Sequence, residues 1–132
     1  MNNRADEITV LVIDDEEPIR ELFKINLEKL NYKCLLASNS KEAIEIHKKY
    51  LKEANNIHIT ILDLNIPGDI GGKEVAVKIR ELNPDAKIIV ASGDSYGDKM
   101  TNYSKHGFDA ALEKNFNREN IKNTIEKILH KD

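Results

Sequence analysis

The chain has 132 residues, a length that fits one ordinary domain, so we expect a single domain over 1–132 with a short N-terminal tail over about residues 1–7. Hydrophobic residues make up 40% and charged residues 33%, a composition that excludes a disordered or collagen-like chain. The 20 lysine and arginine residues and 23 acidic residues give a net charge of −3, so neither nucleic acid nor a membrane surface is an expected partner.

The N-terminal segment lacks the apolar stretch of a signal peptide, and no later run approaches the roughly 20 apolar residues of a membrane span. We therefore expect a cytoplasmic protein. The single cysteine, Cys34, excludes an internal disulfide, and we expect it to be a small buried hydrophobic residue.

The first third of the chain predicts a strand, a helix and a second strand. Residues 8–13 form a short β-branched run that ends at Asp14-Asp15, which indicates a strand buried on both faces. Pro18 suits the first turn of a helix. The expected inner stripe of that helix is Ile19, Leu22, Phe23, Leu27 and Leu30. Residues 33–37 predict the second strand.

The middle of the chain predicts a second helix, a third strand and a glycine-rich loop. Ser40 is the expected N-cap of the helix. Its expected inner stripe is Ala43, His47, Tyr50, Leu51 and Ala54. Residues 57–62 lead up to Asp63 and predict a strand that ends in a carboxylate, and residues 65–72 predict the loop.

The rest of the chain predicts three helices and two strands. Pro84 ends one helix, Gly107 stops another, and Asn117 caps the last. The first two of these helices are expected over 73–82 and about 98–106, and the strands over 87–91 and 108–112. The inner stripe of the last helix is expected to be Ile121, Ile125, Ile128 and Leu129.

Five strand and helix pairs in alternation indicate an α/β fold, a doubly wound parallel sheet with helices on both faces. In such a sheet, ligands bind beyond the carboxyl ends of the strands. The functional site is therefore expected at that edge.

Three carboxylates, a hydroxyl and an amine follow the expected strands at this edge: Asp14, Asp15, Asp63, Ser92 and Lys114. Taken singly, each is as well explained by a turn, a helix start or solvent exposure. Together, three carboxylates in one cleft repel one another unless a cation lies between them, which favours Mg²⁺. A carboxylate can attack a phosphoryl group there, while the metal, the amine and the hydroxyl stabilise the charge on the phosphoryl oxygens. No Gly-x-x-x-x-Gly-Lys-Ser/Thr or Gly-x-Gly-x-x-Gly motif supports nucleotide binding.

Four segments of the chain, and the order in which they occur, resemble the receiver domain of two-component response regulators. The resemblance fits a single-domain receiver like the chemotaxis regulators, or a receiver excised from a hybrid histidine kinase. They are VIDDEEP at 12–18, LDLNIPG at 62–68, ASG at 91–93 and EK at 113–114. The resemblance implies a flavodoxin-like (βα)5 fold with strand order 2-1-3-4-5. It also implies a phosphorelay module, phosphorylated on Asp63 by a histidine kinase or histidine phosphotransfer protein, that binds a further, unknown protein.

The resemblance implies a role for each residue of the site. Lys114 would pair with the phosphoryl group, and Ser92 would turn inward to bond it. Asn65 and Asp94 resemble residues that accompany faster self-dephosphorylation, so we expect a short-lived acyl phosphate. The Mg²⁺ ligands would be Asp14, Asp15, Asp63 and the main-chain carbonyl of Asn65.

Three departures from the family pattern lead to separate expectations. Asn115 stands where proline usually follows the lysine, so we expect a trans bond before it. Gly71 and Gly72 make the loop after the third strand one residue longer than usual. Ala111 replaces a common aromatic residue, so no ring there can follow the inward movement of Ser92.

The signal is instead expected to leave through the loop over 93–97 and the short helix after it, because two glycines allow that loop to change conformation. Tyr96 is a candidate for the space above Ala111, although a partly exposed loop tyrosine explains it as well.

Two other functions compete with this interpretation. A small Mg²⁺-dependent aspartyl phosphatase would use Asp63 as its nucleophile, but such enzymes have a second Asp where this chain has Asn65. The complete acidic set with Ser92 and Lys114 argues against a degenerate receiver acting as a constitutive scaffold, whereas Ala111 and Asn115 keep that alternative open. We therefore expect a chain that accepts a phosphoryl group and loses it again, without a metabolite as substrate.

Overall fold

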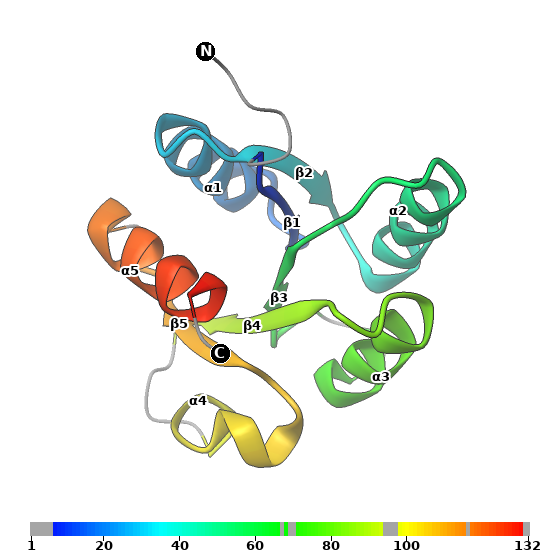
Figure 1. Cartoon of the computed structure of the whole chain (residues 1–132). Helices are drawn as coiled ribbons and strands as arrows, with labels where there is room; N and C mark the ends of the chain where they lie inside the picture. Colours follow the sequence, from blue (N-terminus) through cyan, green and yellow to red (C-terminus); the bar gives the residue numbers. More distant parts are fainter. Residues whose placement is uncertain (1–6, 67, 69–70, 94–97, 116, 131–132) are drawn as a thin grey trace.

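The computed structural model describes residues 7–66, 68, 71–93, 98–115 and 117–130. Its centre is one five-stranded parallel sheet with the order β2-β1-β3-β4-β5, shown in Figure 1. The strands are β1 (Thr9–Ile13), β2 (Lys33–Ala37), β3 (Ile59–Asp63), β4 (Lys87–Ser92) and β5 (Ala110–Glu113). This order confirms the predicted α/β flavodoxin-like fold.

Helices cover both faces of the sheet (Figure 1). On one face lie α1 (Glu17–Lys29) and α5 (Arg118–Leu129), and on the other lie α2 (Ser40–Lys52) and α3 (Gly72–Leu82). The short helix α4 (Asp98–Thr101) and the 3₁₀ helix η2 (Tyr103–His106) lie near β4 and β5. No helix in the described part of the chain is both long and apolar enough to cross a membrane.

The sheet separates two hydrophobic clusters, and β1 and β3 are buried along their whole length because they contribute to both. On the α1 and α5 face, Phe23 and Leu27 pack with the predicted isoleucines of α5. On the α2 and α3 face, Val75 and Ile79 pack with Met100 of α4 and with Phe108. The α4 region is therefore anchored in the same core as α3.

The start of α2 differs from the prediction. Asn39, not Ser40, is the N-cap: its backbone is extended, and its Oδ1 accepts the N–H of Glu42 at 2.9 Å. Ser40 is the first helical residue and is buried. Two polar residues in succession both suit a cap, and the extended backbone of Asn39 decides between them. At α5, Asn117 caps the helix as predicted, since its Oδ1 accepts the N–H of Asn120.

The predicted inner stripes were too wide. Leu22 is 40% exposed and Leu51 is 56% exposed, because the contact between each helix and the sheet is narrower than the hydrophobic pattern. Ala54 lies beyond the end of α2 and is exposed, with a left-handed φ of 59°. Cys34 is only half-buried, since it lies on the edge strand β2.

Two elements near the C-terminal half were also misplaced. The predicted helix over 98–106 is broken into α4 and η2, and Gly107 ends it with a φ of 90°. Phe108 precedes β5 because its N–H bonds the carbonyl of Tyr103 and not a neighbouring strand. The described residues contain no cis peptide bond, so the bond between Lys114 and Asn115 is trans, as predicted.

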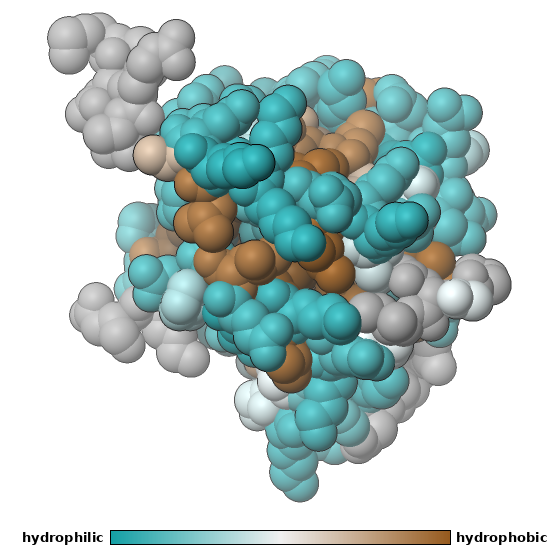
Figure 2. Space-filling model, turned by 90° about the vertical axis from the view of Figure 1, so that its right-hand side faces the viewer, coloured by the Kyte–Doolittle hydropathy of each residue, from teal (hydrophilic) through white to brown (hydrophobic). Residues whose placement is uncertain are grey.

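Figure 2 looks onto the side formed by α2 and α3 and shows hydrophobic surface gathered in a band across its middle. Exposed side chains on these helices include Leu51 and Val77, each more than half exposed. Leu36 and Ile46 line an open groove beside α2. Apolar surface on this face thus extends beyond the core.

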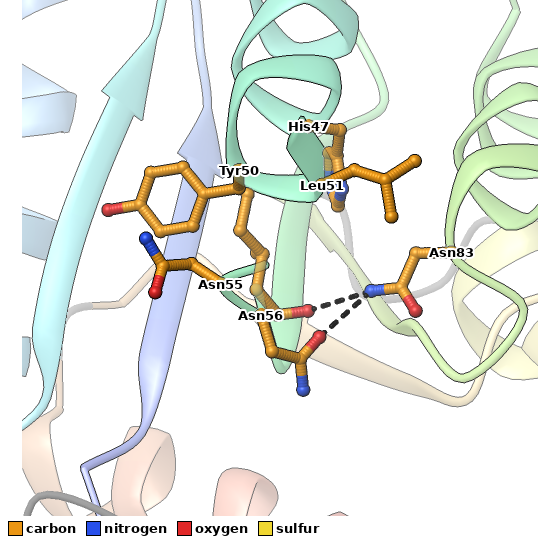
Figure 3. Close-up of a pocket in the computed structure, with 7 residues that line it drawn as sticks. His47, Tyr50, Leu51, Asn55, Asn56 and Asn83 are labelled. Carbon is orange, nitrogen blue, oxygen red and sulfur yellow. Dashed lines mark hydrogen bonds between the residues drawn. The ribbon is translucent and has the colours of Figure 1, made fainter. Parts of the chain in front are cut away.

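A small cavity of about 60 Å³ lies near the amino ends of β3 and β4 (Figure 3). It is lined by His47, Tyr50, Leu51, Asn55, Asn56, Ile57 and Asn83. The Nδ2 group of Asn83 donates to Asn56 Oδ1 at 3.1 Å and to the carbonyl of Ile57 at 3.3 Å. These bonds join the end of α3 to the segment that follows α2.

Candidate functional site at the carboxyl edge of the sheet

The parallel strand register brings the predicted site residues to one edge of the sheet. Asp14 directly follows β1, Asp63 is the last residue of β3, and Ser92 is the last residue of β4. Lys114 directly follows β5, and its N–H donates to the carbonyl of Ser92 at 3.0 Å. The carboxyl ends of four strands therefore bring these four residues to one edge of the sheet.

Lys114 joins the two buried carboxylates. Its Nζ lies 2.7 Å from Asp14 Oδ2 and 3.0 Å from Asp63 Oδ1. Asp14 is 1% exposed and Asp63 is 5% exposed, so both carboxylates are almost withdrawn from water. Burial lowers the pKa of the Lys114 ammonium, but hydrogen bonds and charges from the two carboxylates outweigh it, so the net shift of the pKa is upward. The lysine is held charged between two acidic groups.

Asp14 is fixed through both its main chain and its side chain. Its N–H donates to the carbonyl of Ala37 at 3.0 Å, and its carbonyl accepts Nη1 of Arg20 at 2.8 Å. Its Oδ1 accepts the N–H of Glu16 at 2.9 Å. Its buried Oδ2 forms the ion pair with Lys114 Nζ at 2.7 Å. One carboxylate oxygen is thus aimed into the site.

Asp63 is oriented by the turn that follows β3. Its Oδ1 accepts the N–H of Asn65 at 3.0 Å, in addition to the contact with Lys114. The N–H of Leu64 donates to the carbonyl of Ala91 at 3.1 Å, which continues the pairing with β4 past the end of β3. The main chain of residues 64 and 65 is therefore held beside the carboxylate.

Three carboxylates in succession form an acidic cluster. Oxygen atoms of Asp14, Asp15 and Glu16 lie within 4.8 Å of one another, and the latter two residues are exposed. The sequence analysis did not include Glu16, although its place directly after the two predicted residues was a signal. Asp63 is not one of this group; it is connected to Asp14 through Lys114. The carboxylates of Asp14, Asp15, Glu16 and Asp63 are hard oxygen donors, so the chemistry of this donor set fits Mg²⁺.

Next to these carboxylates lie the end of β4 and the strand β5, both of which are described. Ser92 is buried, whereas Gly93 after it is exposed. Asp94 and Tyr96, which the sequence analysis singled out, lie outside the described residues. Ala111 is half-buried and packs against the same hydrophobic cluster as Tyr103 of η2. A residue of η2 and a residue of β5 therefore pack at the border of the same core.

Fold, strand-end chemistry and sequence comparison agree on one class of protein. Residues 10–126 match the family described as response regulator receiver domain, and the chain belongs to that family. It is a receiver domain of two-component signalling systems.

Relatives of this chain include both kinases and transcriptional regulators. It is 32% identical over 114 residues to the autoinducer 1 sensor kinase/phosphatase LuxN of Vibrio campbellii, a match that covers 86% of this chain and 12% of LuxN. It is 30% identical over 124 residues to the transcriptional regulatory protein ComA of Bacillus subtilis, covering 92% of this chain and 56% of ComA. The chain thus spans a small part of LuxN and little more than half of ComA.

Solved structures share the fold. The response regulator TrrA from Thermotoga maritima, in complex with Mg²⁺ and BeF, is 36% identical with a TM-score of 0.73, and the match covers 92% of this chain and 98% of that one. A response regulator receiver domain protein from Clostridium thermocellum is 27% identical with a TM-score of 0.76, covering 91% and 92% of the two chains.

Proposed function

We propose that Asp63 accepts a phosphoryl group from a phosphohistidine of a histidine kinase or histidine phosphotransfer protein. The observation that carries this proposal is the buried arrangement in which Lys114 bridges Asp63 and Asp14. An ammonium group beside a strand-end carboxylate is suited to stabilise charge on a phosphoryl group that the carboxylate attacks. Membership of the receiver family supports the same assignment.

The transfer requires few changes in the site. A carboxylate oxygen of Asp63 attacks the phosphorus atom, the P–N bond to the partner's imidazole breaks, and the bond pair leaves with the imidazole nitrogen. The product is an acyl phosphate on Asp63. Lys114, already 3.0 Å from the Asp63 carboxylate, then bonds a phosphoryl oxygen, and the Ser92 hydroxyl bonds another. The later attack of water on phosphorus restores the carboxylate and releases inorganic phosphate.

The proposed cation is Mg²⁺, held by Asp14, Asp15, Asp63 and the main-chain carbonyl of Asn65. When bound, it supplies positive charge that offsets the carboxylates and the phosphoryl oxygens. The Asn65 N–H bond to Asp63 keeps that main-chain segment next to the carboxylate. The TrrA structure, which contains Mg²⁺ and BeF, supports this choice of ion.

The proposed output is a change of the surface near β4, β5 and α4 that binds a downstream protein in the cytoplasm. Two short helical elements separated by a break are easier to rearrange than one continuous helix. Amide hydrogen exchange, compared with and without phosphorylation, should change most over residues 93–106. A change confined to 109–112 would place the output elsewhere.

The proposal is tested by incubating the protein with Mg²⁺ and acetyl phosphate and measuring the mass of the intact chain. The wild type should gain the mass of one phosphoryl group, and Asp63→Asn should gain none. Asp85→Asn is the matched control, because Asp85 is an exposed aspartate in the turn before β4. Equal labelling of Asp63→Asn and the wild type would contradict the proposal.

A further inference from the structure

Arg20 contacts both ends of the acidic segment formed by residues 14–16. Its Nη1 donates to the main-chain carbonyl of Asp14 at 2.8 Å, a partly buried bond. Its main-chain N–H donates to the carbonyl of Glu16 at 3.0 Å in the first turn of α1. One residue of α1 therefore binds the first and the last carbonyl of the segment that carries the acidic cluster.

The rest of the segment depends on this connection. Glu16 is the N-cap of α1, and its side chain makes no capping bond. Its N–H instead donates to Asp14 Oδ1, which turns the carboxylate of Asp14 so that Oδ2 faces Lys114. The Arg20 bond holds the carbonyl on the other side of the same Asp14 residue. If that bond is lost, the peptide plane after Asp14 is free to rotate, and the direction of both neighbouring carboxylates changes with it.

We propose that Arg20 is a positioning residue of the cation site, one that fixes the main chain of Asp14 and so aims the carboxylates of Asp14 and Asp15. The inference rests on the proposed function, since it assumes that these carboxylates hold Mg²⁺. Groups that orient metal ligands from behind typically change metal affinity by about 10–100-fold when they are removed. We therefore expect Arg20→Ala to weaken Mg²⁺ binding.

The positive charge of Arg20, taken alone, predicts the opposite change in Mg²⁺ affinity. A guanidinium close to a cation site repels the cation, so its removal should tighten Mg²⁺ binding if charge were its whole effect. A purely structural role predicts a third result, a lower melting temperature with unchanged affinity at a temperature where the protein is fully folded. The direction of the affinity change distinguishes the three roles.

The test is a titration of ¹⁵N-labelled protein with Mg²⁺ alone, well below the melting temperature, following the amide signals of Asp15 and Glu16. Arg20→Ala should bind Mg²⁺ about 10-fold more weakly than the wild type. Its Glu16 amide signal should also move before any Mg²⁺ is added, because the bond to Asp14 Oδ1 is disturbed. Arg20→Lys keeps the charge and one donor for a single carbonyl, so its affinity should stay within about threefold.

Arg80→Ala is the matched control. Arg80 is also half-buried and donates from Nη1 to a main-chain carbonyl, that of Gly107, but it lies on α3 away from the acidic cluster. Its Mg²⁺ affinity should equal that of the wild type. Unchanged or tighter binding by Arg20→Ala, while the wild type binds, would overturn the positioning role alone. A wild type that binds no Mg²⁺ would overturn the cation site and the positioning role together.

Discussion

Buried polar groups have different partners at the two ends of the sheet. At the carboxyl edge, Lys114 Nζ lies 2.7 Å from Asp14 Oδ2 and 3.0 Å from Asp63 Oδ1, so two buried carboxyl groups share one ammonium. At the amino edge, beside the cavity of Figure 3, His47 is 3% exposed and its Nε2 shares a hydrogen bond of 3.0 Å with Thr60 Oγ1. Burial lowers the pKa of His47 to about 4, so this histidine is neutral at pH 7.

The difference separates the proposed reactive end of the sheet from an end that supports the fold. Around the cavity at the amino edge, the hydrogen bonds of His47 with Thr60 and of Asn83 with Asn56 join neutral groups, an arrangement that stabilises the fold at neutral pH. At the carboxyl edge, two buried carboxylates share one partly buried ammonium, and the exposed carboxylates of Asp15 and Glu16 lie beside Asp14, so negative charge is left over. An excess of one charge in a partly buried site favours a cation or a charged reactant.

The largest expected effect is at the carboxyl edge. Lys114→Met leaves Asp14 and Asp63 buried without their cationic partner and should lower the free energy of unfolding by about 3 kcal/mol without metal. Mg²⁺ should recover part of this loss, because it neutralises the same carboxylates. Urea unfolding with and without Mg²⁺ measures both effects. The control is Lys122→Met on the exposed side of α5; equal losses in the two variants would contradict the role of Lys114.

The amino edge should dominate the response to acid. The folded-state pKa of His47, about 4, lies below the usual 6.5, so the unfolded chain binds more protons between these two values. Stability from this group is complete above about pH 6.5 and is lost as the pH falls towards 4, by up to about 3 kcal/mol. His58, whose pKa is also lowered by burial, contributes with the same sign.

Urea unfolding at several pH values checks this assignment. His47→Gln should remove most of the decrease in unfolding free energy between pH 6.5 and 4.5, whereas His130→Gln, at an exposed position after α5, should retain it. A decrease of the same size in His47→Gln would show that the acid sensitivity belongs to other groups.

The smallest expected effect is that of Asp15→Ala, which should change the stability of the metal-free protein and its phosphorylation in opposite directions. Asp15 is exposed, so Asp15→Ala should stabilise the metal-free protein by only about 0.5 kcal/mol, through relief of repulsion within the acidic cluster. The same change removes a proposed ligand, so the melting temperature should no longer rise with Mg²⁺, and phosphorylation should slow. Glu21→Ala, an exposed acidic position on α1, is the control and should keep the response to Mg²⁺. A response retained by Asp15→Ala would remove Asp15 from the ligand set.

The two ends of the molecule were not equally predictable from the sequence. Strand periodicity placed Asp14, Asp63 and Lys114 at one edge, because all parallel strands end there. The contact of Arg20 with the Asp14 carbonyl was not predictable, since it depends on the path of a turn and not on periodicity. At the amino edge, the inward position of His47 was predicted and is confirmed. The cavity was not predicted, because it combines residues from α2, the segment after it and the end of α3.

Helix boundaries show a similar limit. Ser40 and Asn39 are both residue types that commonly cap helices, and only the backbone geometry shows that Asn39 is the N-cap of α2. Leu22 and Leu51 fit a helical stripe in the sequence but lie outside the actual contact with the sheet. Hydrophobic spacing identifies the helix and its general orientation, whereas the width of the buried stripe depends on how closely neighbouring helices pack.

The position of the acyl phosphate in the chain shows whether Asp63 is the phosphoacceptor. Reduction of the phosphorylated wild type with borohydride converts a phosphorylated aspartate to homoserine, which peptide mass mapping locates in the chain. We expect homoserine at position 63, formed only when the phosphodonor and Mg²⁺ were both present. Homoserine at position 14 or 15, with Asp63 unmodified, would contradict it.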